Sequence, residues 1–82
     1  MRSRLSYYRD NNGKEIDLLI EENGVLYPVE IKKAATVGKE ALRNFSVLPS
    51  LNKEIGKGCV ICLSPFPVPL DSSNMIFPIS AI

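Results

Sequence analysis

Two apolar segments joined by a tight turn decide how this chain folds: Glu15-Ile16-Asp17-Leu18-Leu19-Ile20 and Val25-Leu26-Tyr27-Pro28-Val29-Glu30-Ile31-Lys32, connected through Asn23-Gly24. Asn-Gly is a preferred central pair of the two-residue β-hairpin turn, because both positions need a positive φ angle. We therefore expect a hairpin in which Asp17 lies directly opposite Glu30. The same register places Glu15 opposite Lys32.

The two faces of this hairpin differ, because side chains alternate across a strand. One face carries the charged residues Glu15, Asp17, Glu30 and Lys32. The other face is apolar and consists of Ile16, Leu18, Ile20, Tyr27, Val29 and Ile31. Asp17 and Glu30 form a non-hydrogen-bonded pair, in which opposing Cβ atoms are about 4.5–5.5 Å apart. Their carboxylates should repel each other.

This carboxylate pair has two interpretations. A Mg²⁺ ion would relieve the repulsion, since Mg²⁺ is commonly held by one or two carboxylates, waters and substrate phosphate. Lys32 would then stabilise developing negative charge or orient an attacking water. The alternative is a solvated polar face on which Glu15 and Lys32 form an ordinary cross-strand ion pair.

Length and composition indicate the class of protein. The 82 residues predict one domain, and a chain of this size buries only about 60% of its unfolded surface, so stability should be marginal. A hydrophobic content of 45% is typical of a globular protein, and a net charge of +1 gives no overall attraction to nucleic acid or membrane. Because no apolar run approaches the roughly 20 residues of a membrane span, we expect no membrane association and a cytoplasmic location.

Cys59 and Cys62 have the spacing of a redox or zinc pair, but the surrounding sequence favours a structural role. They belong to the apolar run 59–63, which has the pattern of a buried strand. Residues three apart point to opposite faces of a strand. The chain has no histidine and no second cysteine pair, so zinc or thioredoxin-like chemistry is not expected.

The rest of the pattern predicts an α/β fold with a mixed sheet and the element order β-β-β-α-β-β. A first strand over residues 5–9 precedes the hairpin, and two strands over residues 59–63 and 75–79 follow the helix. Helical spacing of apolar residues predicts a helix over residues 37–48. Its N-cap would be Thr36, and Pro49 would mark its end.

A helix between two strands favours a parallel crossover, so the strand 59–63 should lie beside the strand 25–32. Pairing should be weak near Pro28, which has no N–H to donate. We expect the helix to cover the apolar face that contains Leu18 and Val29. The acidic face would then remain open.

The motif in these segments resembles the PD-(D/E)XK nuclease superfamily: Ile16-Asp17, a hairpin, then Glu30-Ile31-Lys32 followed by a helix. More narrowly, Tyr7-Tyr8-Arg9-Asp10, Gly13-Lys14-Glu15-Ile16-Asp17-Leu18-Leu19 and Tyr27-Pro28-Val29-Glu30-Ile31-Lys32 resemble the C-terminal domain of uncharacterised function attached to many AAA-type ATPases of bacteria and archaea. The resemblance spans about residues 5–82. It implies a restriction-endonuclease-like core that lacks its first helix, with residues 1–82 as a single domain and a C-terminal fragment of a larger ATPase.

The resemblance also implies roles for individual residues. Asp17 and Glu30 would bind Mg²⁺, with the backbone carbonyl of Ile31 as a further ligand. Lys32 would be the catalytic lysine of metal-dependent phosphodiester cleavage. Ile16 stands where the superfamily has its name-giving proline.

Three further residues are candidates for contact with DNA. Lys39 and Arg43, four apart on the predicted helix, would form one basic ridge. Tyr8 would stack against a base, and its neighbour Tyr7 is the alternative residue for this role. The alternatives are a solvated helix face for the two basic residues and a core position for the tyrosine.

Two classes of function follow from the sequence. The first is a PD-(D/E)XK nuclease-like accessory domain that uses Mg²⁺ and binds or cleaves DNA. The second is a non-catalytic module that mediates protein contacts or regulates an ATPase domain upstream in the same polypeptide. A further non-catalytic interpretation is a binding domain whose acidic face only adds solubility. A small domain with an uncovered sheet edge would also readily form a homodimer.

Overall fold

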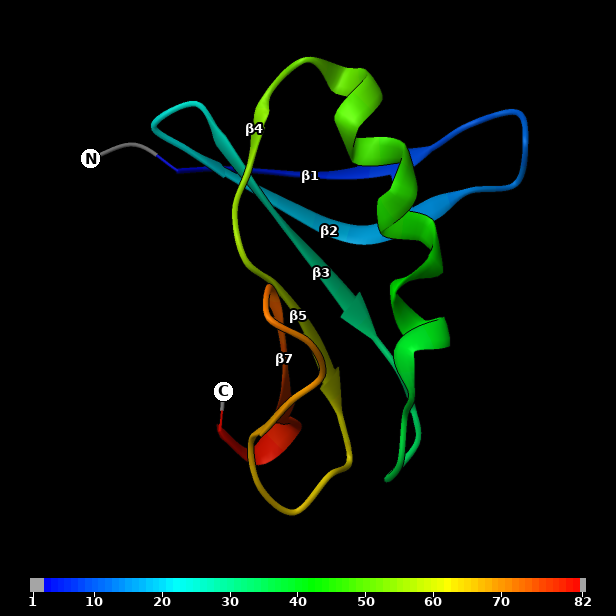
Figure 1. The fold of residues 1–82 in the computed structure, drawn as a ribbon, viewed down its shortest axis with the longest axis vertical. Helices are drawn as coiled ribbons and strands as arrows, with labels where there is room; N and C mark the ends of the chain where they lie inside the picture. The colour runs from blue at the N-terminus through cyan, green and yellow to red at the C-terminus, as the bar shows by residue number, and fades with distance from the viewer. Residues whose placement is uncertain (1–2, 82) are drawn as a thin grey trace.

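A single mixed β-sheet with one long helix on it makes up the fold (Figure 1). The computed structural model describes residues 3–81. In chain order the elements are β1 (Ser3–Arg9), β2 (Glu15–Glu22), β3 (Val25–Ile31), η1 (Lys39–Leu51), β4 (Glu54–Ile55), β5 (Gly58–Cys62), β6 (Val68–Pro69), β7 (Asn74–Pro78) and η2 (Ile79–Ala81). The strand order is β1-β2-β3-β5-β7-β6, and β4 pairs with β3.

The mixed α/β class is confirmed, but the predicted order β-β-β-α-β-β is incomplete. It lacks β4 and β6, which contain two residues each, and the short helix η2. Two residues are too few for a periodic pattern in the sequence, so these strands exist only because a neighbouring strand lies beside them. Within residues 3–81, no helix has the length and apolar character needed to cross a membrane.

The central hairpin forms in the predicted register. Asn23 and Gly24 have φ angles of 55° and 80°, the positive values that a two-residue turn requires. The paired residues run from Glu22 and Val25 at the turn to Leu18 and Val29. Glycine adopts this backbone without the steric cost that a Cβ atom adds.

A β-bulge in β2 changes which residues share a face. Ser6 of β1 pairs with Leu19, whereas Tyr8 pairs with Ile16, so two residues of β2 lie opposite Tyr7 alone. Ile16 and Leu19 therefore belong to one buried cluster although they are three residues apart. The prediction that Ile16 lies on the face of Leu18 is wrong, because that prediction assumed unbroken alternation.

The helix η1 differs from the predicted α-helix in type and bounds. It is a 3₁₀-helix whose N-cap is Gly38 rather than the predicted Thr36, and it continues through Pro49, which was predicted to mark its end. Its two buried residues are Ala41 and Leu48, and Leu42, Phe45, Leu48 and Leu51 form a row of packed apolar side chains at intervals of three. This spacing matches a helix with three residues per turn, which places side chains i and i+3 in line.

The helix covers the face of the sheet that was expected to stay open. Its buried partners on the sheet are Leu19 and Leu26 in one cluster and Val60, Cys62 and Ile76 in the other. Glu30 is the register partner of Val60 and therefore lies on this helix-covered face. The prediction was wrong because both faces of the hairpin carry apolar residues, so alternation alone does not select one.

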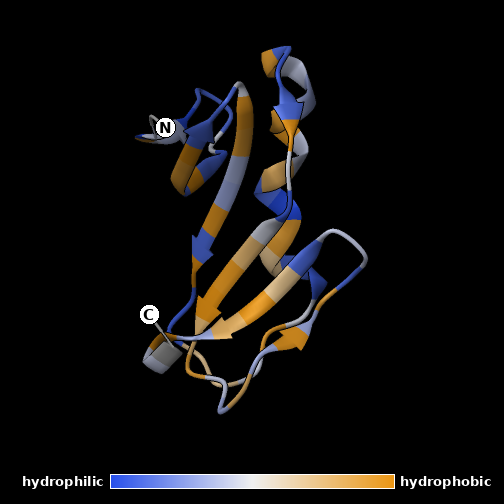
Figure 2. Cartoon of the chain, turned by 90° about the vertical axis from the view of Figure 1, so that its left-hand side faces the viewer, coloured by the Kyte–Doolittle hydropathy of each residue, from blue (hydrophilic) through white to orange (hydrophobic). Residues whose placement is uncertain are grey.

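The opposite face of the sheet is largely apolar, and the long helix η1 does not lie on it. Register pairing places on this open face, among other residues, Leu5, Leu18, Ile20, Tyr27, Val29, Ile31, Cys59, Ile61, Met75 and Phe77. Hydrophobic residues are spread along β3, β5 and β7 in Figure 2. Ile31 remains 55% exposed, which is high for an apolar side chain in a central strand.

The parallel crossover is as predicted. Val29 to Ile31 of β3 pair with Cys59 to Ile61 of β5, while β4 pairs only with Val25 and Leu26. The ladder on this side is thus interrupted at Pro28, which has no N–H to donate. Cys59 and Cys62 are both free thiols. They lie on opposite faces of β5, as predicted from their spacing of three residues in a strand.

Leu48 should contribute more to stability than any exposed leucine, because it is 1% exposed where η1 meets the hairpin. We expect Leu48→Ala to lower the free energy of unfolding by about 2–5 kcal/mol, since it removes buried methyl groups and leaves a cavity. Urea unfolding followed by circular dichroism measures this change. The control is Leu63→Ala, at an exposed position, which should change the free energy of unfolding by less than about 0.5 kcal/mol. Equal effects of the two variants would contradict the described packing of η1.

Candidate functional site

Asp17 occupies the point where the pairing of β2 with β3 ends. The last register pair is Leu18 with Val29, so Asp17 and Glu30 are not ladder partners. Instead, Asp17 Oδ2 accepts a hydrogen bond of 2.9 Å from the backbone N–H of Ile31. In an unbroken hairpin this N–H would bond to the carbonyl of Ile16. The bulge moves that carbonyl away, and the carboxylate takes its place.

Glu30 is the buried carboxylate of the site. The residue is 7% exposed, and its Oε2 atom lies 3.2 Å from the ammonium nitrogen of Lys32. Its Oε1 atom is buried and has no hydrogen-bond partner among the described residues. Burial raises the pKa of Glu30, Lys32 partly offsets this rise, and the negative charge of Asp17 adds to it. The carboxylate is thus held in an environment that disfavours its charge.

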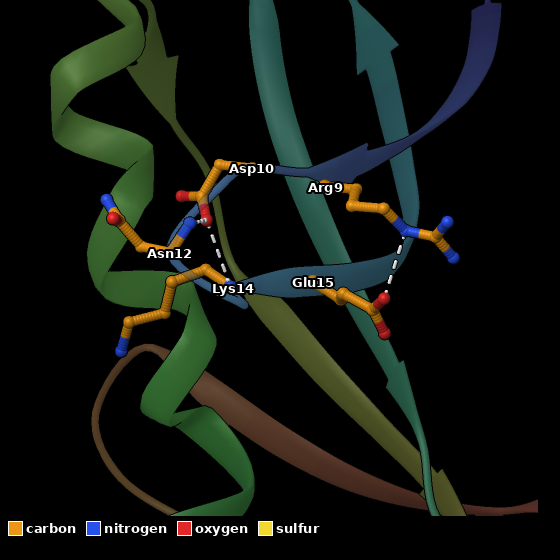
Figure 3. Close-up of polar contacts among 5 residues, drawn as sticks. All are labelled: Arg9, Asp10, Asn12, Lys14 and Glu15. Carbon is orange, nitrogen blue, oxygen red and sulfur yellow. Dashed lines mark hydrogen bonds and ion pairs between the residues drawn. The ribbon is translucent and has the colours of Figure 1, made fainter.

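Lys32 pairs with Glu30 rather than with Glu15, and its side chain remains 45% exposed. Glu15 instead forms an ion pair with Arg9, with 3.0 Å between Nε and Oε1 (Figure 3). The predicted pair between Glu15 and Lys32 is wrong, because the β2–β3 ladder stops before those residues meet. Lys32 directly follows β3, and its backbone N–H donates a hydrogen bond to the carbonyl of Ile61.

Glu40, in the first turn of η1, is an acidic residue that sequence reasoning missed. Hydrogen bonds from its own backbone N–H and that of Gly38 lower the pKa of Glu40, and the charge of Lys32 lowers it further. The carboxylate therefore lies within electrostatic reach of Lys32. The sequence signal would have been an acidic residue in the first turn of the helix that follows Glu30-Ile31-Lys32.

Asp10 organises the turn between β1 and β2. Its Oδ1 atom accepts hydrogen bonds from the backbone N–H groups of Asn12 and Lys14, at 2.9 and 3.0 Å (Figure 3). Its Oδ2 atom accepts one from the Tyr8 hydroxyl at 2.9 Å. The Lys14 N–H contributes most to lowering the pKa of Asp10, and Tyr8 and Asn12 add to it. This turn fixes where β2 begins, and hence where its bulge falls.

The three predicted nucleic-acid contacts lie on two elements, Tyr8 on β1 and the two basic residues on η1. Tyr8 is half-buried and packs against the core, and its hydroxyl donates a hydrogen bond to Asp10. Its ring is therefore part of the packed structure, which matches the alternative of a core position. Lys39 and Arg43 are exposed on η1. In a helix with three residues per turn, residues four apart lie about 120° apart around the axis. The single basic ridge expected from α-helical spacing is therefore not formed.

Asp17 lies beside Ile31 through the hydrogen bond to the Ile31 N–H, and Glu30 pairs with Lys32. The predicted position of Asp17 directly opposite Glu30 is wrong, because the β2–β3 ladder ends at Leu18 and Val29. Among the described residues, no group of three or more histidine, cysteine or acidic side chains is arranged to hold a metal ion. A cation at this position would have two carboxylates as its side-chain ligands. The remaining ligands would be a backbone carbonyl, waters or a substrate phosphate, which is a common way of holding Mg²⁺.

The whole chain, residues 1–82, matches a family model described as a domain of unknown function, DUF4143. The chain belongs to the DUF4143 family. Neither a curated protein nor a solved structure matches it. The predicted resemblance to a domain of uncharacterised function is thus confirmed at the level of the DUF4143 family. Membership of the PD-(D/E)XK superfamily stays a prediction.

Asp10 should stabilise this DUF4143 domain at neutral pH through the three hydrogen bonds that its ionised form accepts. We expect Asp10→Ala to lower the melting temperature at pH 7. Folding lowers the pKa of Asp10. The contribution of Asp10 to stability is therefore fully present above its pKa in the unfolded chain, and it is lost as the pH falls through its pKa in the folded chain. The difference from wild type should therefore shrink below about pH 4. Asn11→Ala, in the same turn, is the control, and a pH-independent difference for Asp10→Ala would contradict the assignment.

Glu30 should have the opposite effect on the pH dependence. Because folding raises the pKa of Glu30, its contribution to stability is present below about pH 4 and is lost as the pH rises through the folded value. In the presence of EDTA, we expect the free energy of unfolding of Glu30→Gln to equal or exceed that of wild type at pH 8. At pH 4 the free energy of unfolding of the variant, relative to wild type, should be lower than at pH 8. Urea unfolding across this range measures the difference. Glu54→Gln, on exposed β4, controls for the change in net charge, and parallel profiles for Glu30→Gln and wild type would refute the prediction.

Proposed function

We propose that this chain is a PD-(D/E)XK nuclease-like accessory domain that binds Mg²⁺ and a phosphodiester of DNA at Asp17, Glu30, Ile31 and Lys32. The observation that carries the proposal is the buried, unpartnered Oε1 atom of Glu30 beside a second carboxylate. A buried charged group without a partner costs free energy, and such groups are rare unless they serve a function.

The donor set fits a hard divalent cation. Asp17 and Glu30 offer carboxylate oxygens, and the Ile31 carbonyl would add a third oxygen. A divalent cation would partner the buried oxygen of Glu30 and neutralise the repulsion that Asp17 adds. Sulfur and imidazole ligands, which softer metals prefer, are not part of this site.

Each residue has a distinct role in the proposed chemistry. A bound Mg²⁺ ion supplies Lewis-acid stabilisation of the phosphate and lowers the pKa of a bound water. The Lys32 ammonium is half exposed at the rim, where it would donate a hydrogen bond to a phosphate oxygen and stabilise charge that develops there. Asp17 also holds the backbone of Ile31, so it would position the neighbouring ligands as well as bind the ion.

The context of the family supports an accessory role. DUF4143 domains are commonly found with AAA-type ATPases. The proposal therefore includes an ATPase domain upstream in the same polypeptide, a cytoplasmic location and a restriction-endonuclease-like core that lacks its first helix. In this arrangement the ATPase would move or remodel the DNA that the accessory domain contacts.

The open apolar face favours a second candidate, a non-catalytic protein-interaction module. Ile31, Leu63 and Ile79 are each more than half exposed and line one apolar hollow. Large exposed apolar patches mark sites of protein contact in many proteins. Under this alternative an ATPase domain or a second copy of the chain covers the face, and Asp17 and Glu30 have no ligand.

Divalent cations should raise the melting temperature if the site binds them. At a concentration of Mg²⁺ or Mn²⁺ about ten times Kd, the expected stabilisation is about 1.4 kcal/mol, which corresponds to roughly 6–11 °C in a domain of this size. Asp17→Asn should abolish this shift, because it removes one of the two carboxylate ligands. Thermal unfolding with and without the ion measures both effects.

Glu15→Gln is the matched control for this experiment, because it removes an exposed carboxylate from the same strand. It should keep the wild-type response to metal. No shift at millimolar Mg²⁺ or Mn²⁺, together with an unchanged Asp17→Asn variant, would exclude the metal site and favour the protein-interaction module.

A further inference from the structure

A hollow of about 290 Å³ lies beside Asp17, and its lining combines chemical groups that the proposed metal site does not use. The lining residues are Tyr7, Tyr8, Arg9, Glu15, Ile16 and Asp17. Asp17 therefore belongs both to the candidate metal site and to the wall of this hollow. A phosphate bound at the metal site would have its neighbouring nucleotide within reach of the hollow.

Tyr7 provides an exposed aromatic surface at this position. It is 72% exposed, and it is the one residue of β1 that lies opposite the two bulged residues of β2, Asp17 and Leu18. The bulge thus places the ring next to the proposed metal ligand. By contrast, Tyr8 points to the other face and packs against the core.

Arg9 is oriented by the ion pair with Glu15. The contact is made through the Nε atom of Arg9, and Figure 3 shows the two terminal nitrogens of the guanidinium pointing away from Glu15. These nitrogens carry donors suited to a phosphate. Arg9 follows Tyr7 by two residues along β1, so both side chains project from the same face of the strand, roughly 7 Å apart.

We infer that this hollow binds one unpaired nucleotide, with its base stacked on Tyr7 and its phosphate on Arg9, so that the substrate class of the site is single-stranded nucleic acid. The inference rests on the proposed function, because it places the nucleotide next to the phosphodiester held at Asp17 and Glu30. An unpaired base offers its π-face to an aromatic ring, whereas the bases inside a duplex are already stacked on each other. Stacking of this kind tolerates any base, so we assign no sequence preference.

The experiment measures binding of a fluorescein-labelled 15-residue oligo(dT), alone and annealed to its complement, by fluorescence anisotropy. Ca²⁺ replaces Mg²⁺ in order to slow cleavage. We expect the wild-type chain to bind the single strand more tightly than the duplex. Tyr7→Ala should raise Kd for the single strand by about 5- to 150-fold, the loss expected for one stacked base, and Tyr7→Phe should retain wild-type affinity. Arg9→Ala should reduce the slope of log Kd against log salt concentration by about 0.7.

Leu5→Ala is the matched control, because Leu5 lies on the same strand and face, is 66% exposed and does not line the hollow. It should change Kd less than twofold. Equal weakening by Leu5→Ala and Tyr7→Ala, or tighter binding of the duplex, would overturn the inference. An unchanged Kd for Tyr7→Ala, with binding that still depends on Ca²⁺ and Asp17, would overturn the stacking role and leave the proposed function intact. No binding of either oligonucleotide by the wild-type chain would overturn both.

Discussion

A carboxylate takes the place of a backbone carbonyl where the hairpin ladder of β2 and β3 ends. The bond from the Ile31 N–H to Asp17 Oδ2 lets the two strands separate without leaving that donor unpaired. The bulge opposite Tyr7 lies at the same point of β2, where β2 has one residue more than β1. The candidate site and the hollow beside it both depend on this local irregularity.

Glu30 shows that the site works against the stability of the fold. A carboxylate beneath η1 loses hydration, and one ion pair with a half-exposed lysine does not satisfy both of its oxygens. An apolar residue at this position would pack against Val60 and its neighbours at lower cost. The arrangement is understandable if the buried carboxylate serves a ligand, which is the basis of the proposed function.

The sheet has one well-covered face and one poorly covered face, and this asymmetry matters in a chain of 82 residues. The helix and the β6 region bury two small clusters, which is a modest core for the conformational entropy lost on folding. Apolar residues such as Ile31 contribute little to stability while they remain in contact with water. The open face is therefore the region in which additional protein surface would stabilise the fold most.

The sequence by itself determined the hairpin and its register from the turn to Leu18 and Val29. Asn23-Gly24 specifies a two-residue turn through local backbone sterics, and register then follows from counting. The parallel pairing of β5 with β3 also followed, because a helix between two strands has few allowed topologies. These features depend on interactions that are close in sequence or on general rules of chain connection.

Only the tertiary structure decided which face of the sheet the helix covers, and hence that Glu30 is buried. It also decided the bulge opposite Tyr7, the partner of Glu15 and the 3₁₀ geometry that separates Lys39 from Arg43. Each of these depends on contacts between segments far apart in sequence, where an apolar pattern on both faces of a strand leaves the choice open. The physical reason is that alternation records which residues share a face, whereas the burial of that face depends on what packs against it.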